Sequence, residues 1–112
     1  MNKGEIINFE KLKHGRDMQH EEFLKFLSAH GSKFWSWGAR GFTKINTSTL
    51  RFRVSGHHHK GHVYIFLNGL DVFEVYLTTI SGKIVEVIED LYIDNIFSVL
   101  DERIEKIADY KF

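Results

Sequence analysis

Four short segments of alternating apolar residues constrain the fold of this chain most strongly. They occupy residues 50–54, 63–67, 73–77 and 84–88. A period of two is typical of strands that bury one face. Asn68-Gly69 and Ser81-Gly82, which separate the later segments, are residue pairs that favour tight hairpins. The sequence therefore predicts consecutive antiparallel strands.

Two further features extend this pattern toward the N-terminus. Bulky residues alternate over residues 34–42 and are followed by glycines, which predicts a short strand and a tight bend. Asn46-Thr47-Ser48 has the composition of a turn. In the segment that follows, Arg51 and Arg53 alternate with apolar residues, so we expect a strand with a basic outer face.

Amphipathic helices are predicted on both sides of the strands. Asp17 is a typical N-cap for a helix over residues 18–30, and Gly31 is a typical residue after a helix end. The second helix has a more regular apolar face, formed by Ile93, Ile96, Phe97, Leu100, Ile104, Ile107 and Ala108. Residues 1–16 fit a short helix, an anchoring strand or a flexible segment.

These elements predict an α+β fold. We expect a four- to five-stranded antiparallel meander with an N-terminal and a C-terminal helix packed on one face. A chain of 112 residues without a linker or an internal repeat fits a single domain over residues 1–112.

Composition narrows the cellular setting. The chain has no Cys, and its N-terminal residues lack the apolar run of a signal peptide. No apolar run approaches the roughly 18 residues that span a bilayer. We therefore expect a cytoplasmic protein with no membrane partner.

Charge is unevenly distributed along the chain, although the formal net charge is zero. Residues 1–62 hold 11 Lys and Arg against 5 Asp and Glu, whereas residues 63–112 hold 4 against 10. This asymmetry fits either pairing between the two halves or two charged surfaces that steer partners.

The acidic half supplies one candidate binding surface. Carboxylates on and near the second helix would form a ridge that docks on a basic partner, or simply the solvated face of that helix. These residues are Asp90, Asp94, Asp101, Glu102, Glu105 and Asp109.

The basic half supplies an alternative surface, in which cations alternate with aromatic residues. This combination is typical of single-stranded nucleic-acid binding. Its candidate residues are Trp35, Trp37, Arg40, Arg51 and Arg53, accompanied by Lys33 and Lys44. The competing interpretation places the tryptophans in the core, and the zero net charge argues against a dedicated nucleic-acid binder.

A histidine cluster is the remaining candidate for chemistry. His57, His59 and His62 have a spacing that suits Zn²⁺ or Ni²⁺, but no Cys or carboxylate accompanies them locally. A solvated basic loop between Gly56 and Gly61 is the simpler interpretation. The sequence carries no common catalytic motif, so we expect no catalytic residues and no cofactor.

Three stretches resemble a family of small uncharacterised proteins of bacteriophages and mobile elements. They are Gly38-Ala39-Arg40-Gly41-Phe42, Leu50-Arg51-Phe52 and residues 62–75, within a similarity that covers residues 32–105. The family pattern runs G-A-K-N-F, L-x-F and L-N-x-x-D-L-Y-x-V. Here Gly41 replaces the Asn of that pattern, and the histidine loop is particular to this chain.

The family has no assigned activity, so the resemblance assigns no functional residue. It implies a bacterial host cell and a protein that binds a host or phage macromolecule, as anti-CRISPR inhibitors of defence nucleases do. We therefore expect a non-catalytic inhibitor of a host protein or nucleoprotein complex, or alternatively a nucleic-acid-binding module. A homodimer formed by pairing of an exposed edge strand is also compatible with a small meander.

Overall fold

The structure, a computed structural model, describes residues 1–105 and has an α+β fold built on a five-stranded antiparallel sheet. Consecutive strands are neighbours, in the order β1-β2-β3-β4-β5. The strands are β1 (Arg40–Asn46), β2 (Thr49–Ser55), β3 (Lys60–Leu67), β4 (Phe73–Thr78) and β5 (Ile84–Leu91). The predicted meander is confirmed.

Turn residues fix the hairpins through side-chain hydrogen bonds to the backbone. The Asn46 Oδ1 atom accepts from the Ser48 amide at 2.8 Å, and Asn68 Oδ1 accepts from the amides of Leu70 and Val72. The β3–β4 loop spans residues 68–72 and is longer than a two-residue hairpin. Asp71 adopts a φ of 65°, and the Asn68 amide donates to the Val72 carbonyl across the loop. Such Asx turns are a common way for Asn to set a loop.

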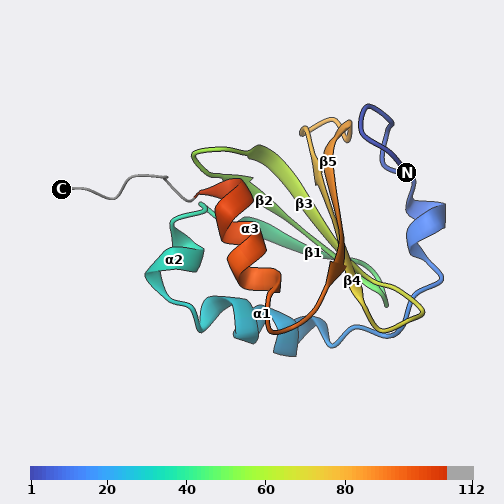
Figure 1. Ribbon diagram of the computed structural model, residues 1–112, viewed down its shortest axis with the longest axis horizontal. Coiled ribbons are helices and arrows are strands. Elements are labelled where there is room, and N and C mark those ends of the chain that lie inside the picture. Colours follow the sequence, from blue (N-terminus) through green and yellow to red (C-terminus); the bar gives the residue numbers. More distant parts are fainter. Residues whose placement is uncertain (106–112) are drawn as a thin grey trace.

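Three helices pack on one face of the sheet (Figure 1). They are α1 (His20–Ser28), α2 (Ser32–Trp35) and α3 (Ile96–Ile104). Helices α1 and α3 confirm the two predicted helices, with different bounds. Helix α1 begins after Gln19 rather than at Asp17, because the Met18 amide donates to the Thr47 carbonyl at 2.7 Å and its side chain is buried.

The strand predicted over residues 34–42 is wrong. Residues 32–35 form the single turn α2, which starts after Gly31, and only Arg40 onward is extended. Phe34 and Trp37 are three residues apart, which is helical spacing, and both are fully buried under the helices. Aromatic packing on the helical layer therefore overrides the alternating pattern.

The main core lies between the helices and the sheet. Leu50, Phe52 and Val54 of β2 point into it, together with Leu27 of α1 and Leu100 of α3. Arg51 and Arg53 consequently lie on the opposite, outer face of β2. Ile107, Ala108 and Asp109 of the predicted second helix lie outside the described residues.

The N-terminal segment covers part of the outer face (Figure 1). It contains the 3₁₀ turn η1 (Phe9–Leu12), and Ile6 forms an isolated antiparallel bridge with Lys83, the residue before β5. Ile7 and Leu12 are buried in a second, smaller core. The sheet supplies that core with Tyr64, Phe66, Tyr76 and Ile84. The segment is thus the anchoring element among the three alternatives considered from the sequence.

No helix among the described residues is long and apolar enough to cross a membrane.

Candidate functional site

A group of cationic side chains occupies the part of the outer face that the N-terminal core leaves open. Strand register places Arg53 directly opposite both Arg40 on β1 and His62 on β3. Residues opposite one another in an antiparallel pair share a face of the sheet. We define the basic patch as these residues and the two that share their face by alternation along β2 and β3, namely Arg40, Arg51, Arg53, Lys60 and His62.

No member of the basic patch forms an ion pair with a carboxylate within residues 1–105. The ion pairs of that part of the chain lie elsewhere, for example between Arg103 and Glu86 and between Lys44 and Glu21. Arg40 donates an Nη1 hydrogen bond to the Gly38 carbonyl at 3.2 Å, which is a neutral acceptor. The patch therefore keeps its positive charge uncompensated at close range.

Two polar atoms in this patch are shielded from solvent and have no hydrogen-bond partner in the described structure. They are Arg51 Nε and His62 Nδ1. Buried polar atoms in native proteins are almost always hydrogen-bonded, and exceptions tend to need an explanation such as a ligand or an ion. The two atoms belong to neighbouring strands, because Arg53 pairs with His62 and Arg51 pairs with Tyr64.

The surroundings of His62 and His59 lower the pKa of both imidazoles. Burial lowers the pKa of His62, and the positive charges of Arg51 and Arg53 lower it further. Burial also lowers the pKa of His59, against a smaller opposing effect of its backbone hydrogen bonds. Both imidazoles therefore favour the neutral form more than a free histidine does.

The tryptophans do not join the arginines on one surface. Trp37 is fully buried, and its indole Nε1 donates to Asp101 Oδ1 at 2.9 Å. Trp35 is 54% exposed, but it belongs to α2 on the helical side of the sheet. The predicted basic and aromatic surface is therefore wrong for Trp37, which is in the core. Its exposed members lie on two sides of the sheet, with Trp35 on the helical side and the arginines on the outer face, namely Arg40, Arg51 and Arg53.

Tyr64 is the aromatic residue that lies beside the arginines. It is directly opposite Arg51, and its buried ring contacts the tilted ring of Phe9 in the N-terminal segment, with 5.9 Å between the ring centroids. Its position two residues after His62 on the same strand follows from the alternation, but the sequence does not show that its partner across the sheet is Arg51.

The acidic residues do not form one ridge. Asp90 lies on β5 with a φ of 57°, and Asp94 lies in the exposed connection to α3. On α3, Asp101 accepts the Trp37 bond, and Glu105 Oε2 accepts from the His57 amide at 2.6 Å. Glu102 is exposed, and Asp109 lies outside the described residues.

The histidine loop attaches to the end of α3 instead of forming a ligand cluster. The His58 amide donates to the Ile104 carbonyl at 2.7 Å, which caps the helix. His59 is buried, with Nε2 at 3.2 Å from the His62 carbonyl. Within residues 1–105 no three His, Cys, Asp or Glu side chains are placed to hold a metal ion, so the described structure gives no support to the alternative of a metal site at His57, His59 and His62.

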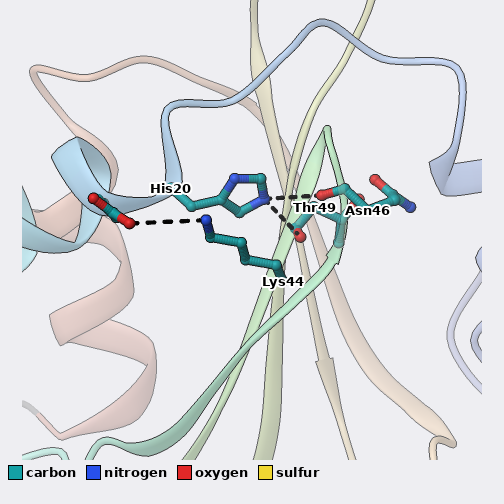
Figure 2. A network of polar contacts seen from close by, with 5 residues as sticks. His20, Lys44, Asn46 and Thr49 are labelled. Atoms are coloured by element: carbon teal, nitrogen blue, oxygen red, sulfur yellow. Dashed lines mark hydrogen bonds and ion pairs between the residues drawn. The ribbon is translucent and has the colours of Figure 1, made fainter.

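A second polar network joins α1 to the first hairpin (Figure 2). His20 Nε2 lies 2.9 Å from the Asn46 carbonyl and 3.2 Å from the Thr49 carbonyl, so this nitrogen carries the proton. Lys44 lies 3.9 Å from Glu21, and both side chains are well exposed. A hollow of about 440 Å³ beside Met18 and Thr47 borders this network. Because His20 is hydrogen-bonded to backbone carbonyls, its role here is to hold the hairpin against α1.

Comparison with known proteins adds no relative: no family model, no curated protein and no solved structure matches this chain. The arrangement of charges therefore carries the functional argument. A cluster of guanidinium groups with a neutral imidazole and no paired carboxylate is suited to holding an anion.

Proposed function

We propose that this protein is a non-catalytic binding protein of the phage or mobile-element type that inhibits a host nucleoprotein complex. The observation that carries the proposal is the basic patch, whose cations have no carboxylate ion pair in the described chain. The phage context comes from the resemblance of residues 32–105 to small proteins of mobile elements. The patch docks on phosphates of the host complex, and the bound protein covers a surface that the complex needs for its activity.

Like charges that are held together raise the free energy of the free protein, and an anionic partner relieves that cost. Arg53 and Lys60 are exposed, so they are available to steer such a partner during encounter. The zero net charge of the chain limits non-specific attraction and leaves the interaction local to the patch.

The acidic surface is the weaker candidate for docking. Asp101 and Glu105 already accept hydrogen bonds from Trp37 and His57, and Arg103 between them pairs with Glu86. A basic partner would compete with these bonds. Glu102 is the exposed carboxylate of α3 that remains available for comparison.

Phage plaquing on a bacterial host that carries an active defence nuclease tests the inhibitor proposal. Expression of the protein should restore plaquing, and Arg53→Gln should reduce the restoration about tenfold or more, because one charged hydrogen-bonding group is worth about 1.5–3 kcal/mol. Lys33→Gln is the matched control, since Lys33 is an exposed cation on α2, in the helical layer.

Restoration that depends on Arg53 and not on Lys33 supports the proposal. Restoration lost in Glu102→Gln but retained in Arg53→Gln would move the docking surface to α3. No restoration against any nuclease class tested would contradict the inhibitor function.

A single-stranded nucleic-acid-binding module is the second candidate, and the placement of Arg40, Arg51 and Arg53 on one face of neighbouring strands favours it. Fluorescence anisotropy with labelled DNA and RNA oligonucleotides over a range of salt concentrations tests it. Three or four phosphate contacts predict a slope of about −2 to −3 in log K against log salt. Absence of binding at low salt would remove this candidate.

A further inference from the structure

We infer that Arg51, Arg53 and His62 form a subsite for a single phosphate group. The inference rests on the proposed binding role of the basic patch, and it names the chemical group that this patch holds. The subsite occupies the part of the basic patch where β2 pairs with β3. Arg40 and Lys60, the other two members of the patch, lie outside it.

Strand pairing brings the three residues together without help from loops. Arg53 and His62 are direct partners in the β2–β3 register, and Arg51 precedes Arg53 on the same face by two residues. Tyr64, the partner of Arg51, completes a block of four side chains. A site on two paired strands is held more rigidly than one on a loop, which favours a preorganised contact.

Unmet hydrogen-bonding capacity points to a ligand at this subsite. Arg51 Nε is a donor that is shielded from solvent and lacks an acceptor in the described structure, and His62 Nδ1 is shielded and unpartnered beside it. A guanidinium N–H that is shielded from water and has no acceptor costs free energy. An oxyanion would remove this cost by accepting hydrogen bonds, because its oxygens can accept two parallel N–H···O bonds from a planar guanidinium. A neutral imidazole adds one further hydrogen bond through an N–H group.

Glu74, a carboxylate of the same outer face, is already hydrogen-bonded and does not compete for the arginines. Glu74 on β4 accepts hydrogen bonds from Tyr76 Oη at 2.7 Å and from Asn68 Nδ2 at 2.9 Å. Thr78, the β4 partner of His62, donates its hydroxyl to the Thr79 carbonyl at 2.8 Å. The neighbouring polar groups are therefore satisfied locally, whereas those of the subsite are not.

Nuclear magnetic resonance of the Arg51 Nε–H group tests the subsite directly. Inorganic phosphate and a short thymidine oligonucleotide are titrated separately, with sodium chloride holding the ionic strength constant. Both should shift the Arg51 Nε–H signal in a saturable way. Arg53→Gln should weaken the apparent affinity about tenfold, and Arg53→Lys should do so less, because it keeps the charge but loses the planar fork.

Lys33→Gln controls for the loss of one positive charge and should leave both titrations unchanged. A much tighter response to the oligonucleotide identifies a nucleic-acid phosphodiester as the source of the phosphate, whereas equal responses identify a free phosphate group. Either result supports the subsite. An Arg51 signal that follows neither titrant, or that follows them equally well in Arg53→Gln, would overturn it.

This outcome is separable from that of the proposed function. Plaquing restored without any Arg51 response to phosphate removes the subsite and leaves the inhibitor. A phosphate response without restored plaquing leaves the subsite and removes the inhibitor.

Discussion

The two faces of the sheet differ in how their side chains pack and in whether their polar groups find partners. On the helical face, aromatic rings stack closely, with Trp37 and Phe97 4.9 Å apart between centroids, and the Trp37 indole has its acceptor in Asp101. On the outer face, the N-terminal segment covers Tyr64 and Phe66, whereas Arg40 and Arg53 beside them are exposed. The Trp37 indole on the helical face is thus hydrogen-bonded within the protein, whereas Arg51 Nε on the outer face has no partner in the described chain.

This difference separates what stabilises the fold from what is available to act. Natural proteins commonly keep unfavourable local arrangements at functional surfaces, while the rest of the molecule supplies the stability. The helical face should therefore dominate the free energy of unfolding. The basic patch should contribute little to it and should instead govern binding.

Trp37→Ala should produce the largest loss of stability. Truncation of a fully buried tryptophan leaves a cavity and removes the donor to Asp101, so we expect a loss of about 3–5 kcal/mol in urea unfolding. Trp35→Ala is the matched control, because that ring is 54% exposed, and it should cost under about 1 kcal/mol. Equal losses would refute the division between the two tryptophans.

Leu12→Ala tests the smaller core on the outer face. Leu12 is fully buried between η1 and the sheet, so its truncation should cost about 2–3 kcal/mol. Leu70→Ala, at an 84% exposed loop position, should cost almost nothing. If chemical unfolding gives the same value for both variants, the N-terminal segment does not bury the outer face in solution.

Acid should weaken the fold in part through His59. Its folded-state pKa is lowered by burial, so the unfolded chain takes up a proton first as pH falls below the ordinary histidine value of about 6.5. Stability present above that pH is lost below it, by at most about 1.4 kcal/mol per pH unit for one proton. Denaturant midpoints between neutral and mildly acidic pH should change less in His59→Gln than in the unaltered protein, and an identical pH dependence would contradict this role.

Arg53→Gln should have the smallest effect on stability. The side chain is exposed and lies among like charges, so the free energy of unfolding should stay within about 0.5 kcal/mol or rise slightly. Thermal unfolding measures this directly. A loss comparable to that of Leu12→Ala would mean that the patch is part of the structural framework.

The sequence predicted the regular elements well where periodicity was clear. Alternation along residues 50–54 placed Arg51 and Arg53 on one face, as observed. Residues 34–42 were misassigned because bulky residues two and three apart fit both a strand and a helical turn, and tertiary packing of Phe34 and Trp37 decided between them. The start of α1 depended on a bond from Met18 to Thr47, which no local pattern reveals.

The sequence predicts the arginines of the candidate site but not their position beside His62. The arginines follow from alternation, but their meeting with His62 depends on the register of β2 against β3. That register is set by the loop over residues 56–59, in which the Gly56 amide donates to the His59 carbonyl. Trp37 and the acidic residues were assigned to surfaces by composition, and only packing shows that Trp37 and Asp101 bond to each other.

Amide chemical-shift mapping during titration with a single-stranded oligonucleotide tests the central claim most directly. We expect the shifted amides to cluster on β2 and β3 around Arg51, Arg53 and His62, and Arg53→Gln to weaken the response. Shifts concentrated on α3, around Glu102, or the absence of any shift at low salt would contradict the assignment of function to the basic patch.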